Sequence, residues 1–229
     1  MTIATTTREK EREKRRFNRL INIISSKYKN ELFTSIRKAM FKAAMSYQKL
    51  GYLPSQQMDQ HEKELRSISF KMYSNSIDLA SDRQFQSIKH AFNLDIEKKD
   101  AVTDFHKLSI NFITNNGMKL AKQVSETTEK NVLGAILRSQ QEGLGVDETV
   151  SVIRDRGSVI SRSRATTIAV TETHNALSWA KHESTKAISE ELNLGLKKEW
   201  ATVEDDRTRP THVNADGQKV DMDDNFIVG

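Results

Sequence analysis

The sequence predicts a mainly α protein, with an elongated helical N-terminal region followed by a small α+β C-terminal domain with a β-hairpin. Two prolines and nine glycines among 229 residues leave few helix breakers. Hydrophobic residues make up 36% of the chain and charged residues 29%, with a mean hydropathy of -0.64, which suits long helices with thin apolar stripes. Apolar residues recur at steps of three and four until Gly195, and they alternate only beyond it.

The first expected helix carries the most regular apolar stripe. Steps of three and four residues keep its members on one helix face. Gly51 and Pro54 are expected to end this helix. The stripe consists of Phe17, Leu20, Ile21, Ile24, Tyr28, Leu32, Ile36, Met40, Ala43 and Tyr47.

Shorter stripes predict further helices, over residues 65–79, 85–92, 102–113 and 120–137. Gly143 and Gly145 are expected to stop the last of these. Asp147 can then cap a short helix from Glu148 to Arg156, with Gly157 at its far end. A long helix is expected from about Ser161 to Leu192.

The chain beyond Gly195 has an extended pattern around Trp200. Residues 205–210 predict a turn, because Pro210 disfavours helical angles at Arg209. Asp216-Gly217 is a strong hairpin signal, which predicts that Thr211–Asn214 pairs with Gln218–Asp221. We therefore expect a helical region over residues 1–117 and a second domain over residues 118–229.

Positive charge is concentrated at the N-terminus. Residues 1–50 contain thirteen Lys or Arg and four Asp or Glu, whereas the rest of the chain is acidic on balance. Such a basic helix could contact duplex phosphates without base readout, seat in a groove of another protein, or simply be a solvated face. The DNA-binding candidates are Arg8, Lys10, Arg12, Lys14, Arg15, Arg16 and Arg19.

Few patterns suggest enzyme chemistry. The chain has no cysteine, no nucleophile elbow and no Gly-rich phosphate loop, and its six histidines lie at no metal-ligand spacing. No apolar run is long enough for a membrane span, and the charged N-terminus does not resemble a signal peptide. We predict no catalytic residue, no metal, no cofactor and no membrane association. One alternative is a metal-dependent nuclease or other phosphate-handling enzyme that uses Asp205, Asp206, Asp216, Asp221, Asp223, Asp224 and His212.

Glu172 is expected on the apolar face of the long helix, together with Ala165, Ile168, Ala169 and Ala176. A carboxylate in that position needs a partner. We expect Arg207 or Arg209 to supply it and so to tie the helix to the hairpin, and a role as a catalytic acid is the alternative.

Three stretches of sequence form a specific pattern. They are Arg164 to Glu172 followed by Asn175-Ala176, Trp200 to His212, and Asp216-Gly217-Gln218 with Phe226. Over about residues 120–229 they resemble the phage head morphogenesis family, minor head proteins similar to protein F of phage Mu. The resemblance marks Glu172, Trp200, Asp206, Arg207, Thr208, Arg209, His212, Asp216 and Gly217 as structural motif residues.

The resemblance implies a minor capsid protein, encoded beside the portal and present in few copies in the procapsid. It would act in head assembly, DNA packaging or genome delivery, in the virion inside the capsid and in the host cytoplasm during assembly. The implied partners are the portal protein, the major capsid or scaffolding protein, and double-stranded DNA bound non-specifically. A non-specific DNA-binding protein is a second alternative. Family members commonly continue past the position of Phe226, so we expect a cleaved, truncated or short variant.

Overall fold

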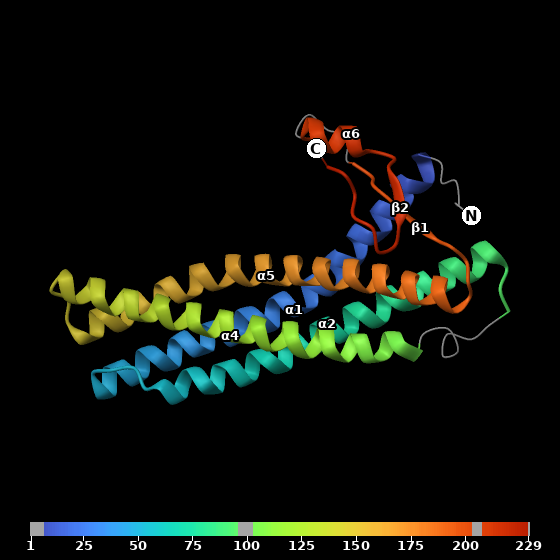
Figure 1. Cartoon of the computed structure of the whole chain (residues 1–229). Helices are drawn as coiled ribbons and strands as arrows, with labels where there is room; N and C mark the ends of the chain where they lie inside the picture. Colours follow the sequence, from blue (N-terminus) through green and yellow to red (C-terminus); the bar gives the residue numbers. More distant parts are fainter. Residues whose placement is uncertain (1–6, 96–102, 203–207, 229) are drawn as a thin grey trace.

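Four long helices form a bundle that carries a small unit at the C-terminal end of the chain (Figure 1). This computed structural model describes residues 7–95, 103–202 and 208–228. The mainly α prediction is confirmed. The long helices are α1 (Thr7–Leu50), α2 (Ser55–Phe92), α4 (Thr103–Gln141) and α5 (Val146–Glu191), and the C-terminal unit contains β1 (Lys197–Glu199), α6 (Pro210–Ala215) and β2 (Lys219–Asp221).

Helix α1 forms as its apolar stripe predicts. All ten stripe residues except the half-buried Phe17 are buried. The helix ends at Leu50, where Gly51 adopts a φ of +76° that favours glycine, and its N–H donates to the Tyr47 carbonyl at 2.8 Å. The Tyr28 hydroxyl donates to the Lys71 carbonyl at 3.1 Å, which joins α1 to α2.

The four long helices share one apolar core. Helix α5 packs mainly along α1 and α2, and α2 also packs along α4. Helices α1 and α5 come close where Gly157 faces Met40, because a Cβ at Gly157 would lie 3.3 Å from the Met40 Cβ. Residues far apart in the sequence therefore pack together in the core of the bundle.

The sequence-based boundaries divided a helix at three places and misplaced the start of α5. The stripes over 65–79 and 85–92 belong to one helix, α2, and those over 102–113 and 120–137 belong to α4. Gly157 does not end a helix, because α5 runs through it. Gly145, rather than Asp147, precedes the first turn of α5, and its N–H donates to the Glu148 carboxylate at 2.8 Å. Tertiary packing against Met40 outweighs the helix cost of one glycine.

A second, smaller apolar cluster fixes the end of α5. It contains Phe85 and Ile88 from α2 and Ile188 from α5, with Leu192, Leu194 and Leu196 packed against it. The chain therefore leaves the bundle in a defined direction before β1 begins.

The C-terminal sheet has two antiparallel strands, as predicted, but the expected pairing was wrong. Strand β2 pairs with β1, with Lys198 opposite Val220, and residues 211–214 lie in α6 instead of a strand. Pro210 explains the helix, because its fixed φ suits the first helical turn. The Asp216-Gly217 turn remains, with a φ of +75° at Gly217, but it joins a helix to a strand.

The expected division between residues 117 and 118 lies inside α4, and both sides of it contribute to the shared core. The two-domain division stays a prediction. Within residues 7–95, 103–202 and 208–228, no helix is both long and apolar enough to cross a membrane.

Candidate functional site

Trp200 lies at the centre of the C-terminal unit. Its half-buried ring makes edge-to-face contacts with two other rings. The ring centroid lies 5.5 Å from that of His212 and 5.2 Å from that of Phe226. The Lys198 amine lies 5.4 Å from the centroid of the Phe226 ring. The indole N–H is buried and has no hydrogen-bond partner among the described residues. Aromatic contacts of this geometry stabilise a small unit that has little other core.

Backbone hydrogen bonds surround the same tryptophan. The Trp200 N–H donates to the Gln218 carbonyl and the Gly217 N–H donates to the Trp200 carbonyl, both at 2.9 Å. The Asp216 carboxylate accepts from the Thr202 N–H at 2.7 Å and from its hydroxyl at 3.1 Å. The Gln218 side-chain oxygen accepts from the Ile227 N–H at 2.7 Å. Each of these polar groups holds the segments around Trp200 in place.

The remaining motif residues lie on the connection into α6. Thr208 is half-buried, and Arg209 is exposed at the residue before the first turn. Asp206 and Arg207, together with Asp205, lie outside the described residues. Thus the structure brings together Trp200, His212, Asp216 and Gly217, whereas Glu172 lies away from them on α5.

Glu172 has a partner that the sequence did not predict. The Tyr73 hydroxyl of α2 donates to the Glu172 Oε2 at 2.6 Å, and Arg209 makes no ion pair with Glu172. The Arg207 alternative lies outside the described residues. Burial, and then the hydrogen bond to Glu172, raise the pKa of the Tyr73 hydroxyl well above its usual range. Glu172 therefore ties α5 to α2, inside the bundle.

Two acidic residues of the C-terminal unit form separate ion pairs with lysines. Asp221 pairs with Lys197 at 2.9 Å, and Asp223 pairs with Lys186 of α5 at 2.5 Å. That hydrogen bond raises the pKa of the Lys186 amine and lowers the pKa of the Asp223 carboxyl. Among the residues described, no three His, Asp or Glu side chains gather as they would around a metal ion. The Asp221 and Asp223 carboxylates thus have partners within the protein. The absence of a metal stays a prediction.

Comparison with protein families gives a match to the C-terminal part of the chain. Residues 130–228 match the family model described as phage Mu protein F like protein. Over these residues the chain is similar to phage Mu protein F like proteins. The resemblance predicted from the motif is confirmed over this range, which we call the Mu F-like segment. No characterised protein and no solved structure matches the chain.

The Mu F-like segment comprises the end of α4, all of α5 and the C-terminal unit. The match links this segment to phage head proteins. Because α5 packs along α1 and α2, the segment shares its core with residues that precede it. Its surface is therefore formed jointly with the N-terminal helices.

The basic candidates lie on the first turns of α1. Arg12, Lys14, Arg15, Arg16 and Arg19 are exposed, and the side chains of Arg8 and Lys10 lie outside the described set. Burial of the stripe begins with Phe17, whose ring meets His174 of α5 with centroids 5.6 Å apart. Glu13 pairs at the surface with Lys181 of α5. The charged turns and the apolar stripe therefore occupy successive parts of one helix.

Sequence reasoning missed two polar residues inside the bundle. His61 is buried, and neither ring nitrogen has a hydrogen-bond partner among the described residues. The Arg164 guanidinium donates to the Val124 carbonyl and the Thr128 hydroxyl of α4, both at 3.3 Å. Burial lowers the pKa of Arg164. His61 lies four residues before Leu65, on the face of α2 that is buried. This spacing could have placed His61 in the core.

Proposed function

We propose that this chain is a minor capsid protein that attaches to the portal inside the procapsid and acts in head assembly, DNA packaging or genome delivery. The observation that carries the proposal is the match of residues 130–228 to the phage Mu protein F like family. The sequence motif that led to the same family includes Trp200, His212 and Gly217, and these residues lie together.

The bundle supports a role in assembly through its shape. Its four long helices have 38 to 46 residues each, so the sides of the bundle form long exposed surfaces. Figure 1 shows these helices side by side, with the C-terminal unit on one side of the bundle. Large exposed apolar side chains, among them Phe41, Met45 and Val159, lie on that lateral surface. Such a surface suits contacts with other structural proteins, including the major capsid or scaffolding protein.

We further propose that the first turns of α1 contact packaged DNA without reading its sequence. Five basic side chains between residues 12 and 19 are exposed, whereas the apolar stripe that follows is buried in the protein. Lysine and arginine side chains bind duplex phosphates with a salt-dependent affinity. The rival nuclease function receives no support from Asp216, Asp221 and Asp223, which pair with lysines or with a backbone N–H group.

Direct binding to the portal tests the function. The purified chain is titrated against the purified portal oligomer of the same phage, with the major capsid protein and the scaffolding protein as separate arms. We expect saturable binding to the portal at physiological salt. Binding to the capsid or scaffolding protein alone would contradict the portal assignment and keep the head-protein assignment. No binding to any of the three would contradict the proposed function.

A further inference from the structure

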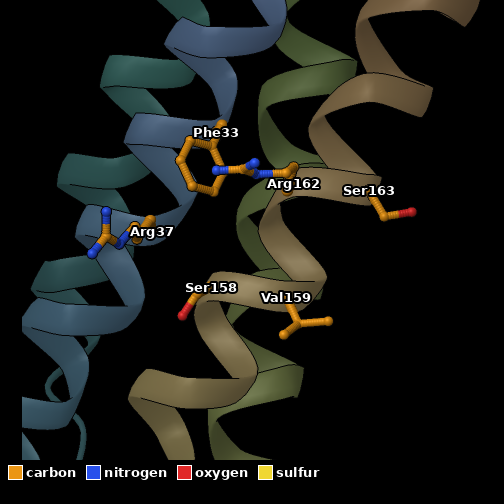
Figure 2. Close-up of a pocket in the computed structure, with 6 residues that line it drawn as sticks. All are labelled: Phe33, Arg37, Ser158, Val159, Arg162 and Ser163. Carbon is orange, nitrogen blue, oxygen red and sulfur yellow. The ribbon is translucent and has the colours of Figure 1, made fainter.

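Helices α1 and α5 leave an exposed groove between them, which we call the α1/α5 groove. It is lined by Phe33 and Arg37 from α1 and by Ser158, Val159, Arg162 and Ser163 from α5. Figure 2 shows the Arg162 guanidinium lying beside the Phe33 ring, with Arg37 one turn away on α1. The groove lies outside the Trp200 cluster and outside the basic turns at the start of α1.

The helices around the groove are strongly basic. Residues 32–48 of α1 and 149–171 of α5 contain seven Lys or Arg, and Asp155 is their only acidic residue. Among the side chains that the structure describes, no carboxylate lies within 4.0 Å of the guanidinium of Arg37, Arg154 or Arg162. Three arginines thus present positive charge that the described part of the chain does not neutralise, and they favour an acidic partner.

Two of these arginines are held in place by aromatic rings. The Arg162 guanidinium lies 5.3 Å from the centroid of the Phe33 ring, and that of Arg154 lies 5.0 Å from the centroid of the Phe41 ring. Stacking on a ring restricts the side chain before any partner arrives. Less conformational entropy is then lost on binding, which strengthens the complex.

Apolar side chains distinguish a protein partner from DNA. Val159 is 76% exposed and Phe41 is 45% exposed beside these arginines. Arginine, aromatic and apolar side chains together are typical of the centre of a protein interface. A phosphate backbone would use the arginines and leave Val159 and Phe41 in water. The groove therefore fits a protein segment that carries both carboxylates and apolar side chains.

We propose that the α1/α5 groove binds an acidic amphipathic helix of the portal protein. A third helix laid along two packed helices can place apolar side chains on Phe41 and Val159 and carboxylates against Arg37, Arg154 and Arg162. This inference rests on the proposed portal association, and it specifies the surface of this chain and the chemistry of the portal segment.

Charge reversal within the full chain tests the groove. The variant Arg37→Glu/Arg162→Glu changes the net charge by the same amount as the control Lys63→Glu/Arg83→Glu, whose residues are exposed on α2. Thermal unfolding of both variants checks that they fold. We expect the groove variant to raise the Kd for the purified portal oligomer at least tenfold. The control should raise it less than threefold.

Equal weakening of portal binding by both variants would overturn the proposal, because general electrostatic attraction would then account for it. Unchanged binding by the groove variant would also overturn it, and portal association itself would stand. A wild-type chain that fails to bind the portal would remove the proposed function together with this inference. The groove variant could instead lose affinity only for a 20-base-pair DNA duplex, or only for a second copy of the chain in sedimentation experiments. Either result would assign the groove to that other partner and overturn the proposal.

Photo-crosslinking gives a second measurement that does not depend on charge. A benzophenone amino acid replaces Val159, and Val213, which is 50% exposed on α6, serves as the control position. We expect the probe at position 159 to crosslink to one portal peptide that is acidic and helical in pattern. Crosslinking of that peptide from position 213 alone, or of a basic portal peptide from position 159, would contradict the proposal.

Discussion

His61 and Glu172 are two ionisable side chains that the helix bundle accommodates in opposite ways. His61 is buried without a hydrogen-bond partner in the described chain, so it is held in its neutral form. Glu172 is half-buried and accepts a hydrogen bond from Tyr73, so its carboxylate has a donor directly opposite. Each arrangement has a measurable consequence for the free energy of unfolding.

His61 should make the bundle sensitive to mild acid. Burial lowers the pKa of His61 from 6.5 to about 4, opposed by Glu64 and reinforced by Arg164. Because the pKa is lower in the folded chain, protonation favours unfolding, so the stability is fully present above pH 6.5 and is lost as the pH falls toward 4. The loss attributable to His61 should be about 3 kcal/mol.

Urea unfolding at steps between pH 7 and pH 4 measures this loss. His61→Leu should flatten the pH dependence in that window, since it removes the titrating group. His106→Leu, at an exposed position of α4, is the matched control and should keep the wild-type slope. Equal slopes for wild type and His61→Leu would show that other groups cause the acid sensitivity.

Tyr73 and Glu172 should be energetically coupled. Tyr73→Phe removes the hydroxyl that donates to Glu172 at 2.6 Å and leaves a half-buried carboxylate without that donor. We expect a destabilisation of about 1–3 kcal/mol. In a double-mutant cycle with Glu172→Leu, the Tyr73→Phe change should cost much less, because no carboxylate remains. Additive free energies in the cycle would contradict the coupling.

At the scale of the elements, α1 combines two surfaces in one continuous helix. Its residues from Leu20 onward supply a buried stripe, and its residues 11–16 are all exposed and all charged. The connection between the two parts contains no glycine or proline, so the charged turns are a rigid extension of the packed part.

Deletion of residues 1–16 tests the role of this extension. We expect weaker binding to duplex DNA and a flatter dependence of log Kd on log salt, because the phosphate contacts are lost. The fold and portal association should persist, since the stripe is intact and the Glu13–Lys181 surface pair contributes little. An unchanged salt slope would contradict the DNA role, and loss of cooperative unfolding would show that the first turns are needed for folding.

Periodicity predicted the helices well and their ends less well. The steps of three and four in α1 identified a face that the structure buries, and Gly51 marked its end. The same reasoning divided α5 at Gly157, because glycine after a helical pattern commonly indicates the end of a helix. Its actual role is the close approach to Met40, a residue more than a hundred positions earlier, which no local pattern contains.

The C-terminal unit shows the same limit. Asp216-Gly217 predicted a turn correctly, but the strand that pairs with β2 lies on the far side of α6. Turn chemistry fixes the local bend and leaves the pairing partner open. Trp200, His212 and Gly217 of the motif lie together, whereas Tyr73 as the partner of Glu172 required knowledge of how α2 packs against α5.

At the scale of the whole molecule, carboxylates of the C-terminal unit hold segments of the chain together. Asp223 attaches the C-terminal unit to α5 through Lys186, and Asp216 accepts two hydrogen bonds from Thr202. Asp216, Asp221 and Asp223 each have a separate partner, an arrangement that differs from the convergence of carboxylates around a catalytic cation.

Divalent cations should therefore leave the melting temperature nearly unchanged. Millimolar magnesium, manganese or calcium would stabilise the folded chain by mass action if a specific site existed. We expect a shift no larger than that produced by the same ionic strength of sodium chloride. A saturable rise that is lost on His212→Ala or Asp206→Ala would contradict this prediction and revive the nuclease alternative.

The composition of assembled heads tests the central claim most directly. Procapsids are purified from the phage that encodes this chain and from a mutant that lacks the portal protein, and the chain is quantified in both by mass spectrometry against an isotope-labelled standard. A minor head protein attached to the portal should be present at a small, fixed number of copies relative to the portal protein. It should be lost from portal-free shells. The same amount of the chain in both kinds of shell, or its absence from complete procapsids, would contradict the account.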